Sequence, residues 1–167
     1  MLRDLLLEKR GAIVQQWVHL TLATYPADAG RFLREEKDPF ANPLGSTIAQ
    51  VLESVFGELL TEMRPDRLRT LLDGVVRIRS VQDFSPSQAI GFIFLLKSVI
   101  REELGKAAGE GQIARELLEF EARIDQVALL AFDLFMQCRE QIFEIRVKEL
   151  RAGNEVALRM LARDRGK

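Results

Sequence analysis

The segment SPSQAIGFIFLL, at residues 85–96, fixes the architecture that the rest of the sequence implies. Ser85 is suited to cap a helix, Pro86 to occupy its first position, and Gln88 to complete a capping box. The apolar residues that follow point in every direction around a helix axis, which is typical of a helix buried on all sides. We therefore predict a central helix that begins at this cap and ends near Gly105.

Further helices are expected around this one. Apolar residues recur every three or four positions along each segment, as one buried helix face requires, and the clearest pattern runs from Pro43 to Met63. No stretch alternates with the period of two that a strand needs. We expect an all-α fold, a single-domain bundle of about six helices with a buried central helix and a long C-terminal helix. The expected helices span residues 2–24, 28–36, 43–63, 65–79, 85–105 and 112–150.

Composition restricts the classes of protein to consider. The chain has 167 residues, a net charge of −1 and one cysteine, so it can form no intrachain disulfide. This charge gives no long-range attraction to nucleic acid or to anionic membranes. The N-terminus lacks the basic-then-apolar order of a signal peptide, and the longest apolar run is far shorter than a membrane span of ~20 residues. We expect a cytoplasmic protein that neither binds nucleic acid nor inserts into a membrane.

Residues that hold metals or cofactors are scarce. His19 is the only histidine, and it lies between two apolar residues of the first expected helix. A side chain at the edge of the core is its simplest interpretation. Cys138 falls within an apolar pattern, which favours inert packing. The sequence has no Walker loop, no Gly-x-Gly-x-x-Gly and no Gly-x-Ser-x-Gly motif. We predict no metal, no cofactor, no catalytic residue and no enzymatic activity.

The last expected helix carries a heptad-like seam. Its apolar residues are spaced alternately three and four apart over about three heptads, the pattern of helices that pair with a partner helix. We expect this helix to form a homodimer, or to pack within the monomer along its first half. Residues 151–167 are expected to form a basic tail. The candidate seam residues are Leu117, Phe120, Ile124, Val127, Leu134, Cys138, Ile142 and Ile145.

A polar cluster precedes and enters the central helix. Its structural interpretation is that Ser85 caps, an arginine pairs with Asp83, and Lys97 reaches solvent or a carboxylate. Its functional interpretation is that free backbone N–H groups and arginines bind an anion or a partner's acidic side chain. The candidate binding residues are Arg77, Arg79, Gln82, Asp83, Ser85, Ser87 and Lys97. An alternative is an enzyme acting on a phosphate or carboxylate substrate through Arg77, Arg79, Asp83 and Lys97.

A family resemblance rests on the run RIRSVQDFSPSQA at residues 77–89, followed by the helix that carries Lys97. These residues resemble the N-terminal domain of RsbRD-type RsbT co-antagonist proteins. Trp17, the Tyr25-Pro26 step and the segments 40–43 and 131–134 are similar to that family as well. The resemblance implies a bacterial, all-helical sensory or regulatory domain at residues 1–150. It also implies a globin-like fold without haem, dimerisation, and a role in signal transduction and stress response.

Two functional hypotheses follow. The first is a non-catalytic regulatory domain that acts through helix-mediated contact with a regulatory protein partner. It would be the input half of a stress-signalling co-antagonist, without the phosphorylatable STAS output domain. The second is a small-molecule sensor that holds an apolar ligand in a globin-like pocket. The candidate pocket residues are Trp17, Phe56, Phe92 and Phe94.

Overall fold

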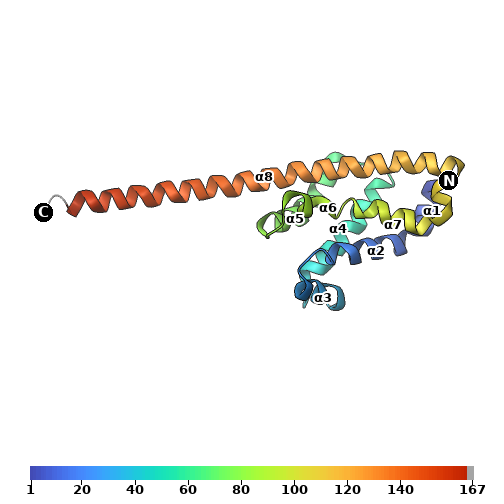
Figure 1. Cartoon of the computed structure of the whole chain (residues 1–167), viewed down its shortest axis with the longest axis horizontal. Coiled ribbons are helices and arrows are strands. Elements are labelled where there is room, and N and C mark those ends of the chain that lie inside the picture. Colours follow the sequence, from blue (N-terminus) through green and yellow to red (C-terminus); the bar gives the residue numbers. More distant parts are fainter. Residues whose placement is uncertain (165–167) are drawn as a thin grey trace. The chain divides into compact units, whose positions relative to one another are not determined.

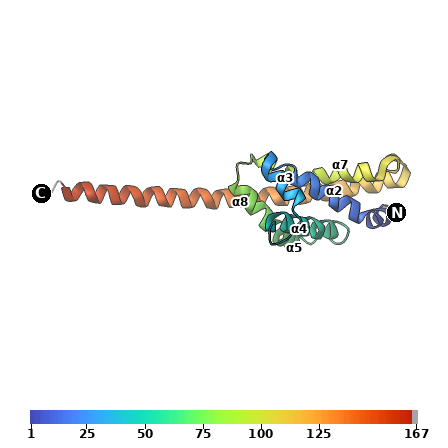
Figure 2. The same cartoon turned by 90° about the horizontal axis from the view of Figure 1, so that it is seen from below.

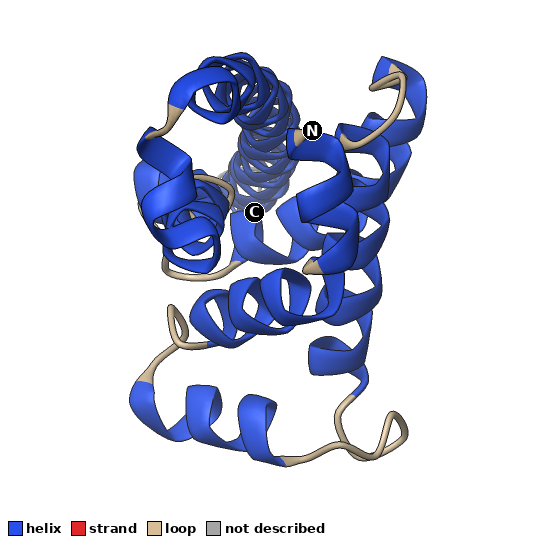
Figure 3. Ribbon diagram, turned by 90° about the vertical axis from the view of Figure 1, so that its right-hand side faces the viewer, coloured by secondary structure: helices blue, strands red, loops and turns tan. Residues whose placement is uncertain are grey.

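The computed structural model describes residues 1–164, and every regular element in that range is a helix (Figure 1, Figure 3). The all-α prediction is therefore confirmed. The chain divides into two compact units, Met1–Phe135 and Met136–Lys167. Residues 165–167, the end of the predicted basic tail, lie outside the described residues. The helices are α1 (Leu2–Glu8), α2 (Arg10–Leu22), α3 (Ala27–Glu35), α4 (Pro43–Leu59), α5 (Pro65–Val81), α6 (Pro86–Gly91), α7 (Leu95–Leu104), the 3₁₀ turn η1 (Gly105–Gly109) and α8 (Gly111–Asp164).

Local sequence sets where the helices begin. Ser85 and Gln88 form the predicted capping box at the start of α6. Asn42 caps α4, because its Oδ1 accepts a hydrogen bond from the Gly45 amide at 2.8 Å. The Nδ2 group of Asn42 donates to the carbonyls of Leu33 and Glu36, both at 2.9 Å. This buried side chain therefore also fixes the loop between α3 and α4.

The core of the first unit is built around α2. This helix packs against both α4 and α7, and α4 packs in turn against α5 (Figure 2). The part of α8 that belongs to the same unit contributes one continuous buried face. Fully buried members of the core include Leu6, Ile13, Trp17, Ile48, Leu52, Val55, Phe56, Leu72, Leu96, Ile100, Ile124 and Ala131.

The predicted central helix is interrupted. A turn at Phe92–Phe94 divides it into α6 and α7. It is also not buried on all sides: Phe92 and Leu96 are buried, whereas Phe94 is 44% exposed. The first predicted helix is likewise divided, at Lys9, and the last continues to Asp164 through most of the segment predicted as a tail. Periodicity does not detect the break at Phe92 because hydrogen-bond donors from other helices stabilise it, as described below.

Two ion pairs, one helical turn apart, hold α7 against α8 within the first unit. Arg101 donates from Nε and Nη2 to the Glu121 carboxylate at 2.6 and 2.8 Å. Lys97 Nζ lies 2.5 Å from the carboxylate of Asp125. A bidentate pair restricts geometry more than a single contact does, so this arrangement fixes the register of the two helices.

Candidate functional site

The residues of the polar cluster predicted at 77–97 do not form one site, because they bond to residues on several different helices. Arg77 pairs with Asp73, one turn earlier in α5, at 3.1 Å. Lys97 pairs with Asp125 on α8. Ser85 and Ser87 lie exposed at the start of α6, and their hydroxyl oxygens are 3.2 Å apart. Asp83 is exposed and Gln82 is half-buried in the same connection. The exposed Arg77 and the half-buried Lys97 therefore have separate carboxylate partners on separate helices.

Arg79 is the member of the cluster that is completely buried, with 0% exposure. Its Nε donates to the Ala89 carbonyl at 2.9 Å. Its Nη2 donates to the Gln88 carbonyl and to the Thr24 hydroxyl, both at 3.0 Å. One guanidinium group thus joins α5 to α6 and to the residues that follow α2.

Aromatic rings surround this guanidinium. Its Cζ lies 4.2 Å from the ring centroid of Phe84, 5.0 Å from that of Tyr25 and 5.2 Å from that of Phe92, which are cation–π distances. Among the described residues, no carboxylate lies within ion-pair distance of Arg79. Burial therefore lowers the pKa of Arg79. Carbonyl dipoles and ring faces, rather than a counter-charge, stabilise this cation.

The interruption between α6 and α7 coincides with this guanidinium. In a continuous α-helix, the Ala89 carbonyl would accept a hydrogen bond from the Ile93 amide. The Ile93 amide donates instead to the Ile90 carbonyl at 3.1 Å, and Arg79 Nε occupies the Ala89 carbonyl. The backbone is tightened to 3₁₀ geometry where a side chain of α5 satisfies the released carbonyl.

Trp17 has the same role one turn later. The Leu96 amide donates to the Ile93 carbonyl at 3.3 Å rather than to Phe92. The Phe92 carbonyl accepts a hydrogen bond from Trp17 Nε1 at 2.7 Å. Trp17 is 0% exposed, so this contact is shielded from water. α2 and α5 therefore each provide a buried donor to the segment between α6 and α7.

The residues predicted to line an apolar pocket are mostly core residues. Trp17, Phe56 and Phe92 are at most 1% exposed, and Phe56 packs edge-on against Phe120 with centroids 6.4 Å apart. Phe94, by contrast, is 44% exposed. Three clefts of the described residues are lined by other side chains. Trp17, Phe56 and Phe92 are therefore explained by packing and by the Trp17 hydrogen bond.

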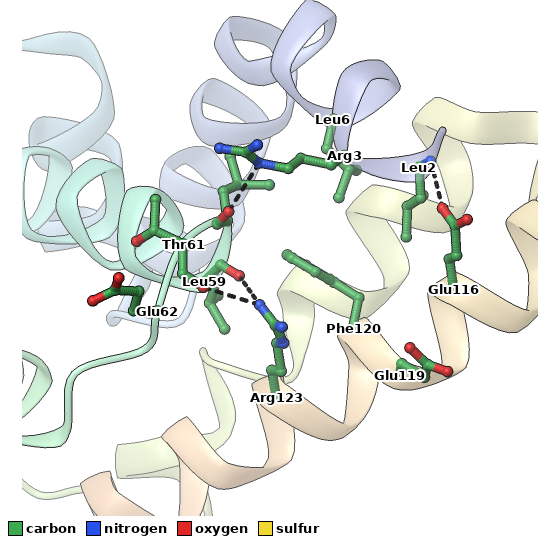
Figure 4. A pocket seen from close by; sticks show the side chains of 11 residues that line it. Leu2, Arg3, Leu6, Leu59, Thr61, Glu62, Glu116, Glu119, Phe120 and Arg123 are labelled. Atoms are coloured by element: carbon green, nitrogen blue, oxygen red, sulfur yellow. Dashed lines mark hydrogen bonds between the residues drawn. The ribbon is translucent and has the colours of Figure 1, made fainter.

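A cleft of about 540 Å³ lies among α1, the end of α4 and the start of α8 (Figure 4). It combines an apolar wall with guanidinium and carboxylate groups. Glu116, on its α8 side, accepts a hydrogen bond from the Leu2 amide at 2.7 Å, and this bond lowers the pKa of Glu116. The lining residues are Leu2, Arg3, Leu6, Leu59, Leu60, Thr61, Glu62, Glu116, Glu119, Phe120 and Arg123.

Both arginines of the cleft cap the carboxyl end of α4. Arg3 Nε donates to the Leu60 carbonyl at 3.2 Å. Arg123 Nη1 donates to the carbonyls of Leu59 and Thr61 at 3.1 and 3.2 Å. Cations are favoured at this end of a helix because the helix dipole is negative there. Both side chains are exposed, so their other N–H groups remain available to an anionic group in the cleft.

The predicted dimer seam divides between the two units. Its first five residues belong to the hydrophobic core of Met1–Phe135. Cys138 is buried, Ile142 is half-buried and Ile145 is 56% exposed. Most of this seam is therefore occupied by packing within one chain. The five core residues are Leu117, Phe120, Ile124, Val127 and Leu134.

A second heptad-like pattern of apolar residues in the same helix was not among the predictions from the sequence. Beginning at Phe143, positions spaced alternately four and three apart carry mostly apolar residues up to Leu161. Phe143 is 68% exposed, Leu150 69% and Leu161 60%. The signal was the same alternation of spacings that revealed the first seam. The residues are Phe143, Val147, Leu150, Asn154, Ala157 and Leu161.

Neither a metal site nor a membrane-spanning helix is found in residues 1–164. No three His, Cys, Asp or Glu side chains gather there in a way that could hold a metal ion. No helix of that part has both the length and the apolarity to cross a membrane. His19 is exposed on α2.

Comparisons with known proteins assign the chain to a family. A family model, described as the RsbT co-antagonist protein rsbRD N-terminal domain, matches residues 11–150. The chain is 26% identical over 157 residues to an uncharacterized protein of Archaeoglobus fulgidus, and the alignment covers 91% of each chain. No solved structure matches at a significant level. Because the family model extends over most of the sequence, this chain belongs to the rsbRD N-terminal domain family of RsbT co-antagonist proteins.

Proposed function

We propose that this protein is a non-catalytic regulatory domain that acts through helix-mediated protein contact. We propose further that it is a homodimer, formed by the part of α8 that lies in the second unit. Membership of the family implies a regulatory or sensory role in stress signalling. The homodimer is inferred from one observation, the exposed heptad that begins at Phe143 and ends at Leu161. A regulatory protein would then bind to this dimer.

Exposed apolar side chains make this heptad a contact surface. Burial of a leucine or phenylalanine side chain stabilises by about 1.5–3 kcal/mol, and Phe143, Leu150 and Leu161 are each at least 60% exposed. Together they form one stripe along the helix.

Asn154 favours a second copy as the occupant of this stripe. An asparagine at one seam position fixes the register of a helix pair by bonding to its counterpart, at some cost in stability. A second copy of this chain supplies that counterpart at the same position. An unrelated partner helix would need its own asparagine there.

The test compares two substitutions of equal chemistry on opposite faces. Leu150→Lys places a charge on the proposed stripe, whereas Ile145→Lys places one on the face of the seam predicted first. Both residues are exposed, so neither change removes a core side chain. We expect sedimentation equilibrium to show a dimer for the unmodified protein and for Ile145→Lys, and a monomer for Leu150→Lys. A monomeric unmodified protein, or loss of the dimer in Ile145→Lys alone, contradicts the proposal.

A second candidate function, sensing of a small molecule, is favoured by the cleft of Figure 4. Its apolar wall suits an apolar chain, and the N–H groups of Arg3 and Arg123 that α4 leaves free can bind an anionic head, although three glutamates also line the cleft. We expect decanoate to bind by titration calorimetry, and Arg123→Ala to weaken binding about tenfold through loss of one charge-assisted contact. Arg10→Ala is the control, because Arg10 lies outside this cleft and pairs with Glu53 on α4. Absence of heat, or equal weakening by both variants, argues against this function.

A further inference from the structure

We propose that the turn at Phe92–Phe94 is a two-state joint, in which the donors Arg79 and Trp17 are exchanged for backbone amides of the same segment. In the second state, α6 and α7 form one continuous helix. Short 3₁₀ stretches within helices often mark such hinges. The inference concerns the first unit alone and does not depend on the homodimer.

The carbonyl groups of the joint have a donor in both states. The Ala89 carbonyl accepts from Arg79 and the Phe92 carbonyl from Trp17 in the observed state. In a continuous helix they would accept from the amides of Ile93 and Leu96. Both carbonyls therefore stay paired in either state, and the cost of the exchange falls on the buried donors Trp17 Nε1 and Arg79 Nε, which makes the second state the less populated one.

Arg79 also has an alternative acceptor. Its guanidinium Cζ lies 5.0 Å from the ring centroid of Tyr25. The Tyr25 hydroxyl and Arg79 Nη1 are both buried, and neither has a hydrogen-bond partner in the observed state. A small shift of the guanidinium after release from Ala89 would pair it with this hydroxyl. In the second state this hydroxyl would replace the Ala89 carbonyl as an acceptor for the guanidinium.

α6 is the side of the joint that can move. Ala89 is the buried residue of α6, whereas α7 contributes Leu96, Val99, Ile100 and Leu104 to the core. Ion pairs to α8 restrain α7 further. Converting the three residues of the turn from 3₁₀ to α geometry rotates α6 by roughly 60° and shortens the segment by roughly 1.5 Å.

This motion would redirect a polar surface. Asp83, Ser85 and Ser87 are exposed at or just before the start of α6. They are three of the seven residues that the sequence predicts as candidate binding residues. The joint would present them differently in its two states, so a partner that contacts them differently in each would shift the equilibrium.

Hydrogen exchange in the unmodified protein tests the joint. Trp17 is the single tryptophan, so its indole Nε1–H gives one NMR signal. In the second state this proton loses its acceptor, while the amides of Ile93 and Leu96 gain α-helical ones. We expect the indole proton to exchange about tenfold faster than both amides after correction for intrinsic rates. Exchange of all three at one rate means local unfolding, and indole exchange as slow as the slowest α4 amides means a fixed turn. Either result overturns the proposal.

Trp17→Phe provides a second, independent measurement. It removes the indole donor and keeps an aromatic ring in the core. We expect the Leu96 amide rate, divided by that of the slowest α4 amide, to fall by about tenfold as the continuous helix becomes favoured. Phe56→Leu, a core change that removes no hydrogen bond, should leave this ratio unchanged. An unchanged or higher ratio in Trp17→Phe contradicts the joint.

Discussion

Replacing Glu58 by glutamine tests whether one buried carboxylate organises the junction between α4 and α5. Glu58 is 4% exposed at the end of α4. Its carboxylate accepts from Arg64 Nη2 at 2.9 Å and pairs with Arg67 Nε at 3.0 Å. It also accepts from the Arg64 amide, at the start of α5, at 3.4 Å. The same group therefore holds two arginines and a backbone donor in place.

The expected cost follows from these contacts. Hydrogen bonds to a charged group contribute about 1.5–3 kcal/mol each when buried. The two arginines are 54% and 56% exposed, so solvent screens most of their contribution. We estimate a loss of about 2 kcal/mol in the free energy of unfolding for Glu58→Gln, which corresponds to a Tm lower by about 4–8 °C for a chain of this size.

The loss depends on pH in a defined direction. The hydrogen bond from the Arg64 side chain holds the pKa of Glu58 below its usual value, although burial opposes this. The folded pKa is thus lower than the unfolded one of about 4.3, so the stabilisation is present above that value. It is lost as the pH falls through the folded pKa. We expect the Tm difference between the unmodified protein and Glu58→Gln to be largest near pH 7 and to shrink towards pH 3.

Differential scanning calorimetry at fixed protein concentration measures this difference. Glu62→Gln is the matched control, because Glu62 is exposed and lies four residues further along the chain, beyond the end of α4. We expect the control to change the unfolding free energy by less than about 0.5 kcal/mol. An equal Tm loss at pH 3 and pH 7, or no loss at pH 7, would show that Glu58 does not stabilise the junction as a carboxylate.

Three further substitutions test other parts of the structure. Asn42→Ala removes three hydrogen bonds, two of them buried, and we expect urea unfolding to show a loss of about 2–3 kcal/mol. Glu121→Gln breaks the bidentate pair with Arg101; the expected loss, about 1 kcal/mol, should be smaller in high salt, and a salt-independent loss would contradict an ionic origin. Asn154→Leu should tighten the proposed dimer in sedimentation equilibrium and admit higher oligomers, because the register determinant is removed.

Features whose partners lie close in sequence were predicted correctly. The predicted capping box joins Ser85 and Gln88, three residues apart, and the Asn42 cap found in the structure reaches Gly45 over the same separation. The donor and the acceptor of each cap are therefore visible in one short window. The apolar period of α4 is also visible within one stretch of sequence. It predicted the start of the helix at Pro43 correctly but placed the end at Met63, whereas the helix ends at Leu59.

The break between α6 and α7 could not be predicted for the opposite reason. Arg79 bonds to Ala89, ten residues away, and Trp17 bonds to Phe92, 75 residues away. No local pattern encodes a donor that arrives from another helix. Arg79 was singled out by its position in a polar cluster, but its complete burial among Phe84 and Tyr25 depends on tertiary packing.

The two heptads of α8 show what periodicity leaves open. An alternation of three and four is the same whether a helix faces its own core or a partner. In the first unit other helices are present to cover such a face, and the residues from Leu117 to Leu134 are buried. In the described part of the second unit α8 is the sole element, so no other helix of that unit can cover the faces that carry Phe143 and Ile145. A helix with two opposite apolar faces can pair through one or join a larger bundle through both. Weaker association in both Leu150→Lys and Ile145→Lys would therefore indicate an assembly of more than two copies.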